Sequence, residues 1–444
     1  MRTGSIARGA RSYRAWRPLI AWLLLLPGLA AAQLEIEITR GAGKQTPIAV
    51  VPFGWQGAGA PPIDVAGVIA ADLERSGRFA PLDENDMLQK PTSGIDVDFD
   101  DWSILGVEAV VVGQLSETGD NRYSLQFQLF DVFGGKQLVG YRMPATRGTL
   151  RHAAHRAADM IFEELTGIKG VFATRIAFVT AKRDPSGETT YSLIVADADG
   201  ENEHTIVESP DPIMSPAWSP DARQIAYVSF EGDESSVFVQ TLRTGNRILV
   251  SKEPGINGAP AFSPDGRKLA LTLGGLDGNL DVYVIDLTTR EKTRLTTNRA
   301  IDTEASWTPD GRMIYFTSDR GGGPQIYRVP ATGGTPERVT FQGSYNARPR
   351  LSPDGTKLAM VHNDRGNFRI AVMDLARGDV LVLSQGRQDE SPSFAPNSDT
   401  LIYATRQSRD GVLETVTADG LVRQRLSSGE GDVREPVWSP FPPN

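Results

Sequence analysis

The sequence predicts a six-bladed β-propeller that follows a small α/β domain. The first observation is a motif of an aromatic residue or leucine, a small residue, proline and usually an acid, which recurs six times in the second half of the chain. Its prolines lie 44, 45, 44, 43 and 44 residues apart. The second observation is that several short apolar runs fill each interval. A period of about 44 residues with four strands is typical of a propeller blade.

The motif also predicts how the ring closes. Its copies are WSPD at 218–221, FSPD at 262–265, WTPD at 307–310, LSPD at 351–354, FAPN at 394–397 and WSPF at 438–441. Runs rich in β-branched and aromatic residues follow the first five copies and are expected to be strands. The sixth copy has no strands after it, whereas residues 175–207 supply three strands with no motif before them. We therefore expect residues 436–438 to form the innermost strand of the first blade.

Residues 33–166 lack the repeat and alternate strand and helix patterns, which predicts the α/β domain. We expect strands at 47–53, 107–113 and 123–129 and helices at 65–75 and 149–165. Residues 167–174 are expected to be a short linker, and residues 175–444 the propeller.

The N-terminus predicts export. Five arginines in the first 17 residues precede an apolar run at 19–26 and three alanines at 30–32, which is typical of a signal peptide comprising residues 1–32. No later apolar segment approaches the roughly 18 residues of a membrane span, so a periplasmic protein is expected. Without residues 1–32 the net charge is about −14, which disfavours nucleic-acid binding. The absence of cysteine excludes disulfides and thiol chemistry.

No catalytic or cofactor motif stands out. A serine hydrolase motif of the G-x-S-x-G type is absent. His152 and His155 lie three residues apart on a predicted helix, but no third ligand accompanies them, so a structural role is favoured. Asp96, Asp98 and Asp100 resemble the start of a calcium loop, but Asp101 stands at the glycine position, which favours a solvated turn. No metal or cofactor is therefore expected from these motifs.

The segments that lead into the six innermost strands are expected to surround one mouth of the central channel. They carry Ser215, Asn257, Gly258, Ala259, Asp302, Thr303, Glu304, Asn346, Ala347, Arg348, Asp389, Glu390, Arg434 and Glu435. Short polar and charged side chains on a rigid rim suit recognition of a protein loop or peptide. The alternative is that they cap strands and hydrogen-bond one another.

The mature chain resembles the TolB family, the periplasmic propeller proteins of the Tol-Pal cell-envelope system. The resemblance rests on the signal peptide, the strand at 47–53, the α/β domain and the six blades. Its most specific stretches are MSPAWSPD at 214–221 and NGAPAFSPDG at 257–266. Ile256 departs from the family, in which a polar residue, often histidine, is expected before Asn257.

The resemblance implies an adaptor rather than an enzyme. The rim residues would bind Pal, the peptidoglycan-associated lipoprotein, and an N-terminal arm would bind the C-terminal domain of TolA. The arm consists of Leu34, Glu35, Ile36, Glu37, Ile38 and Thr39. The implied role is support of outer-membrane integrity and of envelope constriction during cell division.

A secreted propeller hydrolase of the lactonase type, with a metal in the channel, is the alternative. Acidic residues from several blades could bring carboxylates together there and hold a calcium ion. These residues are Asp302, Glu304, Asp389, Glu390 and Glu435. Turnover of a lactone or ester with retained metal would favour the hydrolase, and partner binding that survives chelation would favour the adaptor.

Overall fold

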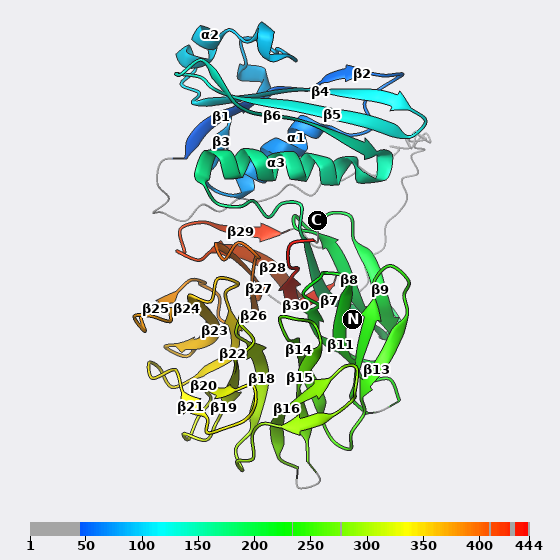
Figure 1. The fold of residues 1–444 in the computed structure, drawn as a ribbon, viewed down its shortest axis with the longest axis vertical. Coiled ribbons are helices and arrows are strands. Elements are labelled where there is room, and N and C mark those ends of the chain that lie inside the picture. The colour runs from blue at the N-terminus through cyan, green and yellow to red at the C-terminus, as the bar shows by residue number, and fades with distance from the viewer. Residues whose placement is uncertain (1–44, 233, 276–277, 408–409, 427–430, 443–444) are drawn as a thin grey trace, which may run out of the picture. The chain divides into compact units, whose positions relative to one another are not determined.

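The computed structural model describes residues 45–442, apart from 233, 276–277, 408–409 and 427–430. The predicted signal peptide and N-terminal arm lie outside the described residues. Within the described part of the chain, a mixed sheet with helices precedes six four-stranded sheets (Figure 1). The predicted α/β domain followed by a six-bladed propeller is confirmed.

The first sheet has the strand order β3-β1-β4-β5-β6, with β2 beside β4. Its strands are β1 (Thr46–Val50), β2 (Gly54–Gln56), β3 (Phe79–Pro81), β4 (Ala109–Gly119), β5 (Arg122–Asp131) and β6 (Lys136–Thr146). Strand β1 runs parallel to β3 and β4, while β4, β5 and β6 are antiparallel. This mixture follows from the connections, because helices join the parallel strands and tight turns join the antiparallel ones.

Two helices, α1 (Val65–Arg75) and α3 (Leu150–Thr166), cover one face of this sheet and bury Ile69, Leu73 and Ile161. The α1 bounds match the prediction, since the Asp64 side chain caps the helix by accepting the N–H of Gly67 at 2.9 Å. The short helix α2 (Phe99–Ile104) buries Trp102 in a second apolar cluster. Single 3₁₀ turns occur at η1 (Glu84–Asp86), η2 (Gly94–Asp96) and η3 (Arg147–Thr149).

Each propeller blade is an antiparallel sheet, and its first strand lies nearest the channel (Figure 1). Three blades comprise β10 (Ile213–Trp218), β11 (Gln224–Ser229), β12 (Ser236–Thr241) and β13 (Arg247–Ser251); β14 (Asn257–Phe262), β15 (Lys268–Gly274), β16 (Leu280–Asp286) and β17 (Lys292–Arg294); and β18 (Asp302–Trp307), β19 (Met313–Ser318), β20 (Gln325–Pro330) and β21 (Glu337–Arg338). Two more comprise β22 (Asn346–Leu351), β23 (Lys357–Asp364), β24 (Asn367–Asp374) and β25 (Val380–Val382); and β26 (Asp389–Phe394), β27 (Thr400–Gln407), β28 (Asp410–Thr417) and β29 (Arg423–Leu426).

The remaining blade joins the two ends of the propeller, as predicted. It has the order β30-β7-β8-β9, with β7 (Arg175–Arg183), β8 (Thr189–Asp197), β9 (His204–Ser209) and β30 (Asp432–Trp438). Strand β30 pairs antiparallel with β7 and places Trp438 opposite Ile176. The Trp438 indole N–H donates to the Thr174 hydroxyl at 2.7 Å. The C-terminal strand therefore closes the ring by hydrogen bonds that join distant parts of the sequence.

The first five copies of the repeated motif form the turns that connect the innermost strand of a blade to its second strand. In one copy, the Ser263 hydroxyl donates to Asp265 Oδ1 at 2.6 Å and accepts the N–H of Lys268 at 2.9 Å. The hydrogen bond from Ser263 lowers the pKa of the Asp265 carboxyl. The same serine-to-aspartate or threonine-to-aspartate bond recurs in the turns at 219–221, 308–310 and 352–354. The carboxylates of these turns thus accept hydrogen bonds from residues of the same turn.

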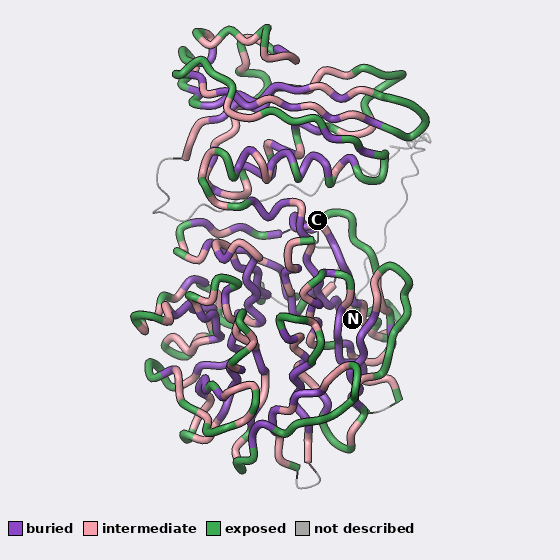
Figure 2. The backbone as a smooth tube through the Cα atoms, viewed as in Figure 1, coloured by how far each residue is buried: buried purple, intermediate pink, exposed green. Residues whose placement is uncertain are grey.

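Burial follows this architecture. Figure 2 shows buried stretches in the strands and along one side of α3, and exposed stretches at turns and hairpins. The propeller core lies mainly between neighbouring blades; one cluster joins Phe178 and Trp438 to Ile402 of the adjacent blade. Among the described residues, no helix combines the length and the apolar character needed to cross a membrane.

Candidate functional site

The six innermost strands share one irregularity that shapes the channel. One residue in each strand, the third in five of them and the fourth in β30, has a left-handed backbone with φ between 46° and 60°, and the pairing register shifts beside it. These residues are Ser215, Ala259, Glu304, Arg348, Ser391 and Glu435. A bulge of this kind breaks the alternation of side chains along a strand. All six residues consequently line a narrow cavity at the centre of the propeller.

Arg348 ties four blades together inside this cavity. Its Nε donates to Glu304 Oε1 at 2.9 Å and its Nη2 to Glu435 Oε1 at 3.3 Å, while Nη1 donates to the Ser391 hydroxyl. Burial acts to lower the pKa of Arg348, but the charges of Glu304 and Glu435 raise it above its usual value. Thr317 supports the network by donating its hydroxyl to Glu304 Oε2 at 2.8 Å.

The channel carboxylates do not assemble as the metal hypothesis requires. Glu304 and Glu435 both bind Arg348, and Asp302 accepts two bonds from Arg320 Nη2 at 2.9 and 2.7 Å. Asp389 accepts the Thr405 hydroxyl at 2.5 Å. Within the described ranges, these acids form no group whose ligand atoms lie close enough together to hold a metal ion, so the geometry gives the alternative hypothesis no metal site at these residues.

Four of the predicted rim residues are buried and hold the loops that lead into the channel. Each is the first residue of its innermost strand: Asn257, Asp302, Asn346 and Asp389. Asn257 Oδ1 accepts the Ser251 hydroxyl at 2.6 Å, and its Nδ2 donates to the Glu253 carbonyl at 2.7 Å. These side chains position the mouth of the channel. Ala347 is also buried, whereas Gly258 and Thr303 are half-buried beside them.

The accessible part of the rim combines charge with apolar surface. Glu390 is half-buried and Arg434 is exposed, with Arg434 Nε donating to Asp432 Oδ2 at 2.8 Å. Three apolar residues at the start of innermost strands are exposed to 40% (Met214), 51% (Ile256) and 48% (Ile301). We call these three residues the apolar rim. Sequence reasoning did not assign Ile301 to the site, although it directly adjoins the predicted rim residue Asp302.

A second cluster of titratable groups joins α1, α3 and the turn after β8. His155 Nδ1 lies 2.6 Å from Asp72 Oδ2, and its Nε2 lies 3.7 Å from Asp199 Oδ2. Arg75 pairs with Asp72, and Arg151 pairs with Asp199. Burial acts to lower the pKa of His155, but Asp72 and Asp199 raise it above its usual value. We call these five residues the ionic cluster. Because both carboxylates already bind guanidinium groups, the cluster is suited to hold α1, α3 and the turn after β8 together rather than to bind a cation.

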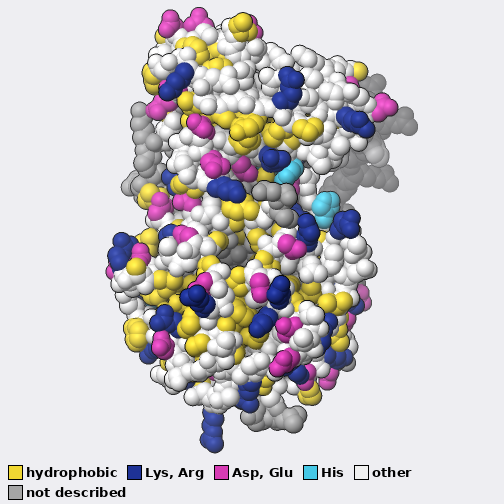
Figure 3. Space-filling model, viewed as in Figure 1, with side chains coloured by type: hydrophobic (Ala, Val, Ile, Leu, Met, Phe, Trp, Pro, Cys, Tyr) yellow, Lys and Arg dark blue, Asp and Glu magenta, His cyan; other side chains and the backbone are white. Residues whose placement is uncertain are grey.

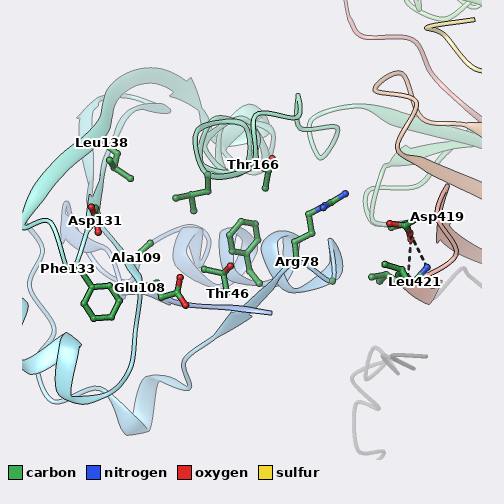
Figure 4. Close-up of a pocket in the computed structure, with 15 residues that line it drawn as sticks. Thr46, Arg78, Glu108, Ala109, Asp131, Phe133, Leu138, Thr166, Asp419 and Leu421 are labelled. Carbon is green, nitrogen blue, oxygen red and sulfur yellow. Dashed lines mark hydrogen bonds between the residues drawn. The ribbon is translucent and has the colours of Figure 1, made fainter. Parts of the chain in front are cut away.

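A cleft of about 540 Å³ is lined by residues of the α/β domain and of the turn after β28 (Figure 4). Apolar Phe133 and Leu138 line it together with the charged Arg78 and Asp419. Thr46, the first residue of β1, also lines the cleft.

Comparisons with known proteins match both parts of the fold. A family model of the TolB amino-terminal domain matches residues 34–138, and one of the TolB beta propeller domain matches residues 162–442. Curated proteins described as "Tol-Pal system protein TolB" from Nitrosococcus oceani and Xanthomonas euvesicatoria pv. vesicatoria are 53% and 49% identical, over 95% of this chain and 96% and 97% of their own lengths. The crystal structure of TolB from Acinetobacter baumannii matches with a TM-score of 0.83 and 42% identity, covering 92% of this chain and 100% of that chain.

Proposed function

The chain belongs to the TolB family of Tol-Pal system proteins, and from this membership we propose that it is a non-enzymatic periplasmic adaptor that holds two envelope proteins. One partner is the lipoprotein Pal, bound at the channel mouth. The other is the C-terminal domain of TolA, bound by the arm at residues 34–39, which precedes β1. By holding both, the adaptor supports outer-membrane integrity and envelope constriction during division.

The observation that carries the Pal proposal is the composition of the channel mouth. Exposed apolar side chains occur there at Met214, Ile256 and Ile301, beside the charged Glu390 and Arg434. Apolar anchors with a charged periphery are typical of protein interfaces. The buried first residues of the innermost strands keep this surface rigid, so a partner loop pays little ordering cost on binding.

Calorimetric titration of residues 33–444 with the periplasmic domain of Pal tests this proposal. We expect saturable binding that Ile256→Asp and Ile301→Asp each weaken at least tenfold, because a carboxylate would be buried against an apolar partner. Ile104→Asp is the matched control, since Ile104 is an exposed apolar residue at the end of α2, in the α/β domain. Absence of binding by the folded protein, or equal effects of all three changes, would contradict the proposal.

A separate titration tests the arm. Deleting residues 34–39 should abolish binding of the TolA C-terminal domain and leave Pal binding unchanged. Repeating the Pal titration with a chelator distinguishes the adaptor from the metal-dependent hydrolase, because adaptor binding requires no metal. Loss of Pal binding on deletion of the arm would show that the two sites are not separate.

A further inference from the structure

The second mouth of the channel opens on the face that carries the repeated turns. It is a funnel of about 490 Å³, and apolar side chains gather around the centre of the propeller in Figure 3. Every blade contributes one large apolar residue to its wall: Trp218, Phe262, Trp307, Leu351, Phe394 and Trp438. Prolines of the repeated turns, among them Pro220 and Pro264, complete the lining. The funnel shares no residue with the apolar rim.

The polar groups of this wall already form hydrogen bonds within the protein. The indole N–H of Trp307 donates to the Ala261 carbonyl at 3.0 Å, and that of Trp218 to the Val437 carbonyl at 3.2 Å. The turn carboxylates bind serine or threonine hydroxyls of their own turns. The surface that remains for a ligand is therefore mainly the faces of aromatic and proline rings.

One cation lies at the narrow end of the funnel. The residue before the large apolar residue is small in five innermost strands, at Ala217, Ala261, Ser306, Ser393 and Val437, and is Arg350 in the sixth. Arg350 lines both the funnel and the narrow central cavity. Its Nη1 donates to the Pro349 carbonyl at 2.9 Å, which is its one hydrogen bond within the described residues.

The neighbouring acids do not occupy the remaining donors of Arg350. Glu304 and Glu435 are close enough to influence its charge, but their carboxylates bind Arg348. Burial lowers the pKa of Arg350 from its usual value, so its charge is incompletely compensated. The N–H groups of a guanidinium match the two oxygens of a carboxylate.

We propose that the funnel binds a small amphiphilic carboxylate. The apolar body of the ligand packs against the aromatic and proline rings, and its carboxylate accepts hydrogen bonds from Arg350. Apolar walls with one convergent charged group are the usual design of a small-molecule site. The inference is independent of the proposed adaptor function, because it concerns the opposite mouth of the channel.

Titration of residues 33–444 with 4-phenylbutyrate, followed by calorimetry and tryptophan fluorescence, tests the proposal. We expect saturable binding at one site and at least tenfold weaker binding of the uncharged 4-phenylbutanol. Arg350→Met should weaken 4-phenylbutyrate binding at least tenfold, whereas Arg434→Met, at the other mouth, should leave it unchanged.

The comparison of acid and alcohol uses the unmodified protein, so the test does not depend on the folding of a variant. The proposal is overturned if 4-phenylbutyrate does not bind saturably, if the alcohol binds equally well, or if folded Arg350→Met protein retains full affinity.

Discussion

Replacing Arg348 with methionine is expected to destabilise the propeller by about 3 kcal/mol. The change leaves Glu304 and Glu435 facing the channel without their shared cation. Their side chains are only 21% and 11% exposed, so little water replaces the guanidinium. Removing one partner of a buried ion pair costs about 3–5 kcal/mol, and the residual exposure places this site at the lower end. Methionine keeps most of the aliphatic packing of the arginine side chain. The loss of stability therefore measures the effect of removing the positive charge.

Urea unfolding followed by tryptophan fluorescence measures this loss. A change of about 3 kcal/mol lowers the midpoint by about 1 M if the denaturant slope is near 3 kcal/mol/M. Arg434→Met is the matched control: it breaks an exposed pair with Asp432 and should cost less than about 1 kcal/mol. Replacing Glu304 and Glu435 with glutamine in the Arg348→Met background should recover more than half of the loss. The reasoning is refuted if Arg348→Met is as stable as the unmodified protein, or if the glutamines restore nothing.

Two further predictions concern charge and backbone conformation. The pKa of His155 is raised in the folded protein, so the stability that its charge provides is complete below the unfolded pKa of about 6.5 and is lost as the pH rises through the folded pKa. The unfolding free energy should therefore fall as the pH rises above about 6.5 in the unmodified protein and fall less in His155→Gln; parallel pH profiles from urea unfolding would contradict this. Arg290 has a φ of 65° at a turn position where the equivalent turns of two other blades have Gly245 and Gly378. Arg290→Gly should raise stability by about 0.5 kcal/mol in thermal unfolding, and a lower melting temperature would contradict the strain argument.

The propeller was the part of the fold that the sequence predicted best. The same pattern of strands recurs in each copy of the repeat, so the spacing between copies is enough to locate the blades. The α/β domain has no such redundancy. Helix α1 was predicted from its apolar spacing, but β6 was missed, since much of its surface is exposed and its pattern is weak. The six-residue helix α2 was predicted to be an acidic turn. Its aspartates make the segment polar, so the sequence pattern does not indicate that Trp102 is buried.

The repeat predicts that the loops into the innermost strands lie near the channel. Five of the predicted rim residues line the central cavity, namely Ser215, Ala259, Glu304, Arg348 and Glu435, and the binding role of the rim stays a prediction. Which side chain turns inward depends on the bulge within each innermost strand, where residues such as Glu304 and Arg348 have positive φ. A bulge is a backbone irregularity that a two-residue alternation cannot reveal. The exposure of Ile256 likewise depends on how the loop is held by Asn257, which only three-dimensional packing determines.

The closing strand has a consequence for how the molecule is made. Strand β30 is the last strand of the chain, and its neighbour Ser439 bonds to Arg175, 264 residues earlier. A ribosome produces β7 long before its partner exists, and until then β7 presents an open edge that can recruit a strand from another molecule. Contacts between such distant segments form slowly, because a long loop must first be closed. A chain that lacks β30 would keep the strands of the five other blades and leave the edge of β7 unpaired.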